Sequence, residues 1–232
     1  MTTLDPRLLH ARSTDLRRYP AGTVLTQAPN SGPALLWVTE GWMTFACEGP
    51  THPLFDGGGA QIYMAGDPVI PRGPDGSQPG YRIEAVSDLT LIPICNDHWR
   101  AMRLAVPEVI RQVVVFRQMI VQEALVRNRI LKGAPVLSRT ALLLIEIAHR
   151  ARRLGRDVER DLVLPLGAAV VGASLDVPAA EAGRALDFLV DEAILSRNAA
   201  GVLRILDPGR LARLAGLASA PTAPVDLAFF AH

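Results

Sequence analysis

The stretch of sequence that decides the fold is residues 166–207, which read LGAAVVGASLDVPAAEAGRALDFLVDEAILSRNAAGVLRILD. Apolar residues recur at helical spacing before Asp176 and again after Pro178, with a short break between the two runs. Two such stripes separated by a tight turn predict a helix-turn-helix, whose second helix spans residues 178–191. Asp176 stands where a turn glycine is common. Asp tolerates left-handed backbone better than most residues, so the turn is expected to form.

A short β-hairpin is predicted directly after the second helix. Ile194 and Leu195 form one apolar run, residues 202–205 form the next, and a turn with Gly201 lies between them. A helix-turn-helix with such a wing can place its second helix in the major groove of DNA. The C-terminal part is therefore a candidate nucleic-acid reader.

The composition bounds the kind of protein without identifying a partner. The chain has 232 residues, of which 49% are hydrophobic, enough for one large domain or two small ones. Its formal net charge is +1, so attraction to phosphate must come from local clusters of cations. No apolar run of about 18 residues appears, and the N-terminus lacks the apolar core of a signal peptide. We therefore expect a soluble, cytoplasmic protein without membrane contact.

Residues that could carry catalysis or hold a metal do not form a recognisable set. Cys47 and Cys95 lie far apart and are expected to be buried thiols. None of the five histidines lies in a metal-binding motif, so neither a metal nor a cofactor is expected. No nucleophile–base set or pair of carboxylates stands out. The chain is therefore expected to have no catalytic residues and not to be an enzyme.

The chain divides into an all-β part, a long helix and the winged part, which makes the fold class α+β. Short strands separated by Gly and Pro clusters predict an N-terminal β-roll of the jelly-roll (double-stranded β-helix) type. Asn96 is expected to cap a short helix after the roll, and Ser138 the first helix of the winged part. The expected domains are a roll at 1–105, a long helix at 106–132, a winged helix-turn-helix domain at 133–216 and a loosely ordered tail at 217–232.

The long helix carries apolar residues on two sides, so it must bury both. One side can cover the roll and the other can meet a second copy of the chain. The alternative is a helix buried inside a single core. The row expected to form the dimer interface is Val109, Val113, Phe116 and Ile120. The second apolar row is Ile110, Val114, Val121 and Leu125.

Taken in this order, the chain resembles the Crp–Fnr family of bacterial transcription regulators over residues 17–215. In the roll, the resemblance rests on YPAGTVL at 19–25, VTEGW at 38–42 and AGD at 65–67. In the winged part, it rests on AGRAL at 182–186, EAIL at 192–195 and ILD at 205–207. The resemblance implies a homodimer joined along the long helix and a cyclic-nucleotide-binding-like sensor roll. It also implies that the winged domain binds double-stranded promoter DNA, with RNA polymerase as a further partner.

The roll departs from the family members that bind cyclic AMP. Those members carry a Gly-Glu pair and an Arg-Ser pair that hold the ribose and the phosphate. Here residues 66–69 read GDPV, and no Arg-Ser pair precedes Tyr81. We therefore expect the roll not to bind cyclic AMP, which leaves its small-molecule effector unidentified. A phosphate needs a fixed cation or a nest of N–H groups, so the candidate effector-binding residues are Gly66, Asp67, Arg72 and Arg82.

The second helix of the helix-turn-helix keeps only part of the family's DNA-reading pattern. Ala179 and Ala180 replace a polar pair, whereas Arg184 is kept. Alanine can touch a thymine methyl group but cannot make a bidentate hydrogen bond to a base. Arg184 either contacts DNA or forms a surface ion pair, and two wing residues either contact phosphates or are solvated turn residues. The candidate DNA-binding residues are Pro178, Ala179, Ala180, Glu181, Gly183, Arg184, Arg197 and Asn198.

Two classes of function remain open at this point. The helix-turn-helix spacing, Arg184 and the wing favour a DNA-binding transcription regulator. The Ala179-Ala180 pair and the electrically neutral C-terminal part favour a protein-interaction module that has the same fold but has lost its DNA-reading side chains.

Overall fold

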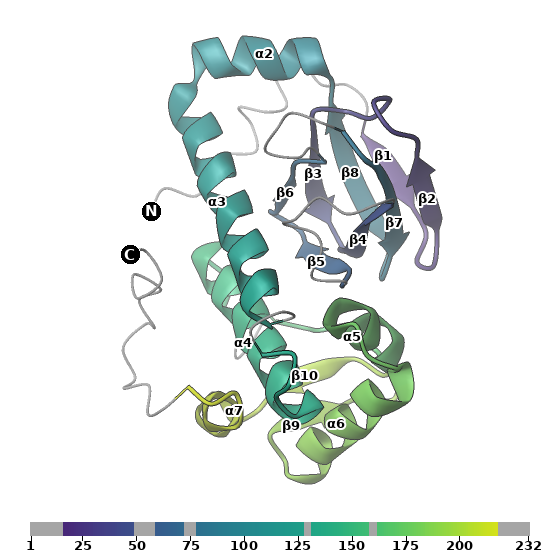
Figure 1. Cartoon of the computed structure of the whole chain (residues 1–232), viewed down its shortest axis with the longest axis vertical. Coiled ribbons are helices and arrows are strands. Elements are labelled where there is room, and N and C mark those ends of the chain that lie inside the picture. The colour runs from purple at the N-terminus through teal and green to yellow at the C-terminus, as the bar shows by residue number, and fades with distance from the viewer. Residues whose placement is uncertain (1–15, 49–58, 72–77, 128–130, 158–161, 218–232) are drawn as a thin grey trace.

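The computed structural model describes residues 16–48, 59–71, 78–127, 131–157 and 162–217. Its N-terminal part is a roll of two four-stranded antiparallel sheets (Figure 1). One sheet has the strand order β1-β8-β3-β6 and the other β2-β7-β4-β5. The strands of the first sheet are β1 (Arg17–Tyr19), β8 (Leu89–Ile94), β3 (Leu35–Glu40) and β6 (Pro68–Val69). Those of the second are β2 (Val24–Gln27), β7 (Gly80–Ala85), β4 (Trp42–Glu48) and β5 (Gln61–Met64).

Alternating side chains fill the space between the two sheets. In β7, for example, Tyr81, Ile83 and Ala85 are buried, whereas Arg82 is exposed. This alternation follows from the two-residue period of a strand, which sends successive side chains to opposite faces. The core between the sheets therefore forms from one residue in two along each strand.

Two helices connect the roll to the winged part. Helix α2 (Asn96–Ala105) lies at one end of the roll, and α3 (Pro107–Leu125) runs beside it toward the winged part (Figure 1). Pro107 occupies the first turn of α3, where the missing N–H costs no intrahelical hydrogen bond. Residues 128–130 of the expected long helix lie outside the described part of the chain.

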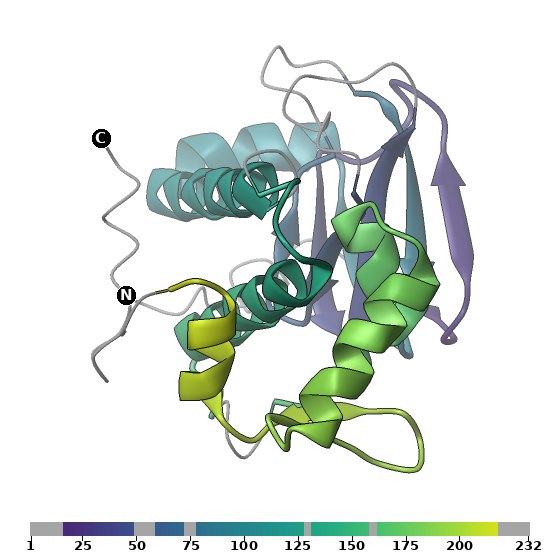
Figure 2. The same ribbon diagram turned by 60° about the horizontal axis from the view of Figure 1, so that its bottom comes forward.

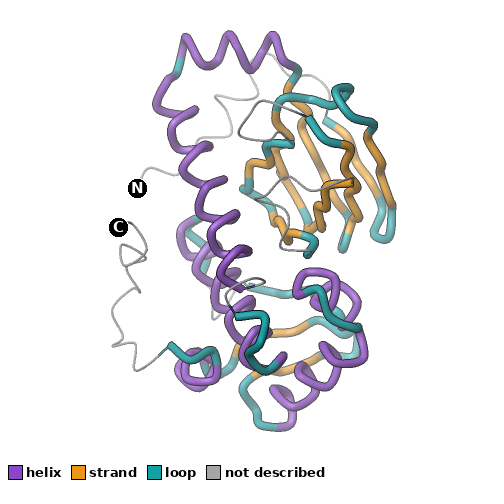
Figure 3. The backbone as a smooth tube through the Cα atoms, viewed as in Figure 1, coloured by secondary structure: helices purple, strands orange, loops and turns teal. Residues whose placement is uncertain are grey.

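The described residues of the winged part form four helices and a hairpin. They are α4 (Val136–Arg153), α5 (Ala168–Leu175), α6 (Ala179–Asp191), β9 (Leu195–Arg197), β10 (Leu203–Ile205) and α7 (Pro208–Leu214). Leu164 pairs with Leu203 as an isolated bridge beside the hairpin. The expected helix-turn-helix and wing are thus confirmed, and Figure 3 shows strands only in the roll and beside the winged helices.

One hydrophobic core joins the winged part to the roll. Trp42, Ile62 and Met64 of the roll share a cluster with buried residues of α4, α5 and α6. A backbone hydrogen bond of 2.8 Å from the Ala60 N–H to the Ala173 carbonyl oxygen crosses the same boundary. Because apolar burial and a backbone hydrogen bond both cross the boundary, the two parts pack as one body in this structure.

Several local expectations need correction. Helix α4 begins at Val136 with Pro135 at its cap position, so Ser138 lies inside the helix and does not cap it. Asn96 is the first residue of α2, and Cys95 occupies the cap position. Cys95 is exposed, so the expectation of a buried thiol is wrong for it. Among the described residues, no helix is both long and apolar enough to cross a membrane.

Candidate nucleic-acid interface and sensor roll

The turn between α5 and α6 depends on two residues. Asp176 has φ 54° and ψ 52°, the left-handed conformation that the sequence predicted for it. Gly172 in α5 lets the next helix approach closely, since a Cβ there would lie 2.9 Å from the Val177 carbonyl oxygen and 3.1 Å from Ala179 Cα. The turn and the close approach fix the angle between the helices, and hence the direction in which α6 presents its outer face.

Helix α6 buries one face and exposes the other. Ala182, Leu186 and Leu189 are buried in the shared core, and Ala185 is buried as well. Pro178, Ala179, Ala180 and Arg184 are exposed, whereas Glu181 and Gly183 are half-buried. Figure 2 brings this helix to the front of the molecule. The N-terminal half of α6 therefore presents a small apolar surface and one cation to solvent.

Arg184 stands apart from the acidic residues of its own helix. It has no hydrogen bond or ion pair with any residue in the described part of the chain. The first turn of α6 also lacks a side-chain cap. Free backbone N–H groups and the positive end of the helix dipole favour an anion at this end. The exposed end of α6 thus combines a free guanidinium with a helix N-terminus.

The two wing residues have partners within the chain. Arg197 forms an ion pair of 2.7 Å with Asp187 of α6. The Asn198 side-chain oxygen accepts hydrogen bonds from the backbone N–H groups of Ala200 and Val202, at 3.0 and 2.9 Å. The side-chain oxygen of Asn198 therefore stabilises the wing turn. Because the guanidinium of Arg197 holds Asp187, it neutralises an acid beside the exposed face of α6.

The expected effector-binding residues do not gather around one cavity. Arg82 lies on the outer face of β7 and pairs with Glu84 at 3.2 Å. Asp67 is fully buried and accepts a hydrogen bond of 2.9 Å from the Met64 N–H. Gly66 has φ 100°, and a Cβ on it would meet the Leu154 side chain at 3.0 Å. Arg72 lies outside the described residues.

Asp67 instead contacts the winged part. Its carboxylate lies 3.3 Å from the Arg150 guanidinium of α4, and both side chains are almost fully buried. Burial raises the pKa of Asp67 to about 6, although Arg150 and the Met64 N–H both act to lower it. Arg156 adds a hydrogen bond of 2.7 Å to the Ala65 carbonyl oxygen. The loop with the family-like AGD motif is thus a contact between domains.

More buried charges surround the boundary between α3 and α4. Arg127 forms an ion pair with Glu146 of α4, and Arg139 donates to the Arg127 and Leu175 carbonyl oxygens. Burial raises the pKa values of both Glu123 and Glu146, and the repulsion from Glu146 raises that of Glu123 further. These groups connect the end of the long helix to the helix-turn-helix. The sequence pattern does not reveal these buried charged residues, because their partners are far apart in the chain.

Aromatic side chains fill the part of the roll interior that faces α3. The Phe45 ring lies 5.1 Å from the Tyr81 ring and 6.2 Å from the Tyr63 ring, between centroids. All three residues are buried in one cluster with Ile120 of α3. Aromatic rings thus occupy the space between the β4 sheet and α3.

The structure places the expected dimer row of α3 against the roll of the same chain. Val113 and Ile120 are 0% and 3% exposed, and Phe116 packs on the same core. The Val109 side chain lies outside what the structure describes. A side chain buried within its own protomer cannot also line a seam, which corrects the assignment of Val113 and Ile120. The assignments of the half-buried Phe116 and of Val109 stay predictions. In the second row, Val114 is 41% exposed, and the half-buried Val121 and Leu125 follow on the same side.

Comparison with known proteins bears on the fold. No protein-family model and no curated protein matches the sequence. Among solved structures, FixK2 from Bradyrhizobium japonicum is 19% identical, with a TM-score of 0.62 over 89% of this chain and 98% of that one. A CRP/FNR family transcriptional regulator from Thermus thermophilus is also 19% identical, with a TM-score of 0.56 over 87% and 98% of the two chains.

A third solved structure has a similar fold. A CooA mutant from Carboxydothermus hydrogenoformans is 17% identical, with a TM-score of 0.58 over 87% of each chain. The common architecture is the one described above, a roll, a long helix and a winged helix-turn-helix. This chain has the α+β fold of the CRP/FNR family of transcriptional regulators, as the sequence predicted.

Proposed function

We propose that this protein is a DNA-binding transcription regulator that acts as a homodimer. The observation that carries the proposal is the exposed N-terminal half of α6, where Ala179, Ala180 and the unpaired Arg184 face outward on a helix fixed by its turn. Such a helix suits the major groove, and the free N–H groups at its start suit a phosphate. The fold shared with transcriptional regulators supports the same function, and an enzymatic role has no support in the site.

The dimer is proposed to form along the second apolar row of α3. Val114 and its neighbour Val115 are 41% and 47% exposed, on a helix whose other side packs Val113 and Ile120 against the roll. A two-fold dimer through this row would place two copies of α6 about 34 Å apart, one turn of DNA. The twofold symmetry then favours a palindromic operator.

Recognition of sequence is proposed to rest partly on DNA shape. The two alanines can touch thymine methyl groups, but only Arg184 on this face can make a bidentate contact to guanine. Because few direct contacts to bases are available, more of the discrimination between DNA sequences must come from DNA bending and groove width. We expect modest discrimination for each half-site.

Cyclic AMP is proposed not to be the effector. Arg82 points away from the roll interior, Asp67 is held by Arg150, and aromatic rings fill the space beside α3. None of these groups is then left to hold a ribose or a phosphate. Titration calorimetry with cyclic AMP at about 1 mM should show no saturable heat. A micromolar dissociation constant would contradict this part of the proposal.

Selection from a pool of random duplexes tests the regulator itself. The purified full chain at about 100 mM salt should enrich a palindrome with half-sites about one helical turn apart. Failure to enrich any sequence would favour the second candidate, a protein-interaction module on the same fold. The observation behind that candidate is the two alanines, which offer no hydrogen bond to a base.

A further inference from the structure

A cavity opens between the two sheets of the roll, at the edge away from α3. Its walls come from β1, β3 and β8 of one sheet and from β2 and β7 of the other, and its volume is about 140 Å³. Figure 1 shows β1 and β2 on the side of the roll opposite to the long helix. The cavity is therefore separate from the candidate effector residues Gly66, Asp67 and Arg82, none of which lines it.

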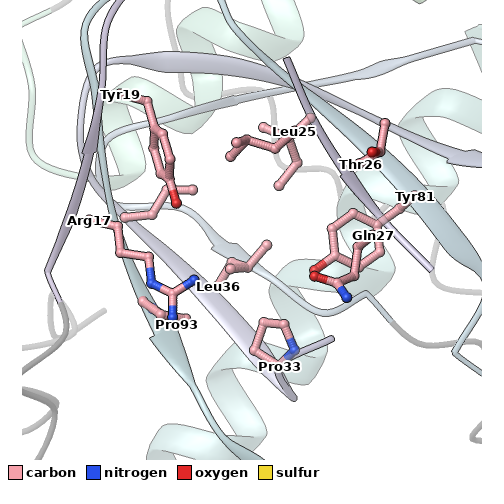
Figure 4. A pocket seen from close by; sticks show the side chains of 11 residues that line it. Arg17, Tyr19, Leu25, Thr26, Gln27, Pro33, Leu36, Tyr81 and Pro93 are labelled. Atoms are coloured by element: carbon pink, nitrogen blue, oxygen red, sulfur yellow. The ribbon is translucent and has the colours of Figure 1, made fainter. Parts of the chain in front are cut away.

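Apolar side chains form part of the cavity wall, and polar side chains lie on two of its sides. Leu25, Leu36, Ile83 and Leu91 supply the apolar surface, together with Pro33 and Pro93. Figure 4 shows Arg17 and Tyr19 on one side of the cavity, and Gln27 and Tyr81 on the other. Cross-strand pairing explains both groups, since Arg17 and Tyr19 share one face of β1 and Gln27 lies opposite Tyr81.

Two of these polar groups have no partner in the part of the chain that is described. Tyr81 is 3% exposed, yet its hydroxyl makes no hydrogen bond to a described residue. The Arg17 guanidinium likewise makes no hydrogen bond or ion pair with a described residue, although its charge acts to lower the pKa of Tyr81, and no described carboxylate lines the cavity. Burial raises the pKa of Tyr81 to about 12, so its hydroxyl keeps its proton at neutral pH. A phenol hydroxyl that lines a cavity and makes no hydrogen bond to a described residue can donate to a ligand or a water there.

We propose that this cavity binds a small monocarboxylate with an apolar body. One cation, hydroxyl donors and apolar walls match a single carboxylate joined to a hydrocarbon group. The walls disfavour a doubly charged phosphate, because one guanidinium cannot offset the cost of burying two charges. The volume limits the apolar part to about one ring, since a cavity of roughly 150 Å³ admits benzene.

In this arrangement the Arg17 guanidinium donates to the carboxylate at one side of the cavity. The Tyr81 hydroxyl donates a hydrogen bond to the carboxylate from the other side. The ring or alkyl group of the ligand lies against Leu36 and Ile83. Binding at this site is independent of DNA contact, because α6 and the wing contribute none of its lining. Failure of the DNA-binding proposal would therefore leave this inference standing.

Benzoate and its neutral analogue benzamide test the proposal on the full chain. Calorimetry should give a saturable benzoate isotherm with a dissociation constant of about 1 mM or below, and at least about tenfold weaker binding of benzamide. Arg17→Gln and Tyr81→Phe should each weaken benzoate binding, the first by about tenfold or more because it removes a charge-assisted bond.

Arg18→Gln is the matched control, because the next residue on β1 points to the opposite face and does not line the cavity. It should bind benzoate like the wild type, and thermal unfolding of all three variants checks that they fold. Absence of saturable benzoate binding at about 10 mM would overturn the proposal. Equal binding by the Arg17→Gln and Arg18→Gln variants, or equal binding of benzamide, would overturn it as well.

Discussion

The carboxylate of Asp67 and the guanidinium of Arg150 lie 3.3 Å apart, although 83 residues separate them in the chain. Asp67 belongs to the loop that leads into β6 of the roll, and Arg150 lies near the end of the first helix of the winged part. The pair is buried at the edge of the core that the two parts share. If the winged part moves relative to the roll, the ion pair must therefore break, or both residues must move together.

Replacing Arg150 by Met tests how much this pair matters. The variant leaves the Asp67 carboxylate buried without its counter-charge, so we expect a loss of about 3 kcal/mol in the free energy of unfolding near pH 8. The loss should be smaller near pH 5, because the carboxyl group can then take up a proton. Urea unfolding at the two pH values measures both effects.

A second substitution serves as the control for the first. Asp67→Asn in the Arg150→Met background removes the unpaired charge and should recover most of the lost stability near pH 8. If the double variant is as unstable as Arg150→Met alone, the cost comes from lost packing of the arginine stem and not from the charge.

The wild-type protein should become less stable as the pH rises from about 4 to about 6. Burial raises the pKa of folded Asp67 to about 6, whereas an unfolded Asp titrates near 3.9. Between these values the folded state binds more protons than the unfolded state, so the free energy of unfolding falls with rising pH. About two units of difference correspond to roughly 2 to 3 kcal/mol.

Glu123 and Glu146 act in the same direction, because burial also raises their pKa values. Asp67→Asn should remove the part of the pH dependence that lies between about pH 4 and 6 and leave the rest. Urea midpoints measured across this range check the expectation. An unchanged slope in the variant would show that other carboxyl groups cause it.

Two glycines of the helix-turn-helix should respond in opposite ways to alanine. Gly172→Ala places a Cβ 2.9 Å from the Val177 carbonyl oxygen, which is backbone and cannot give way cheaply. We expect it to destabilise the protein by about 1–3 kcal/mol. Gly183→Ala meets only the Ala168 Cβ at 3.4 Å, and should stabilise α6 by up to about 1 kcal/mol through helix propensity. Thermal or urea unfolding of the pair measures the contrast.

The elements that the sequence predicted well are those fixed by local interactions. The two helical stripes, the Gly201 turn and the left-handed Asp176 all depend on residues within a few positions of one another. The contacts of the Asn198 side-chain oxygen are local too, since it accepts hydrogen bonds from backbone N–H groups of its own turn.

The sequence failed where the deciding contact is long-range. A helix with two apolar rows does not reveal which row covers the roll, and only the packed structure shows that Val113 and Ile120 do. Asp67 looked like an effector residue because its motif resembled a ligand-binding loop, whereas its partner Arg150 lies in another domain. The available signal in the sequence is the position of Arg150 in α4. It follows the buried Ile147 by one helical turn and therefore falls on the buried face of the helix.

Charges placed on the second apolar row of α3 should separate the proposed dimer. Val114→Glu with Leu125→Glu puts unpaired carboxylates into the seam, and the chain should sediment as a monomer that keeps its helical circular dichroism. Val113→Glu is the contrasting variant. It buries a charge inside the roll core and should unfold the protein instead. A wild-type chain that sediments as a monomer at micromolar concentration would contradict the proposed dimer.

Arg184→Ala distinguishes two roles for the cation on the outer face of α6, which has no partner among the described residues. If Arg184 reads a guanine, the variant should lose about 1–3 kcal/mol of binding free energy on the selected site and much less on random DNA. If it holds a phosphate, affinity should fall equally on all sequences, and the slope of log affinity against log salt should shrink by about one.

Arg103→Ala is the matched control, because Arg103 is also exposed but lies on α2, outside the winged part. Fluorescence anisotropy on the selected duplex and on a scrambled duplex, over a range of salt concentrations, resolves the outcomes. We expect Arg184 to read a guanine. Arg197 already neutralises the nearby Asp187, so this acid does not compete for the Arg184 guanidinium. Equal binding by Arg184→Ala, Arg103→Ala and the wild type would mean that α6 does not contact DNA through this face.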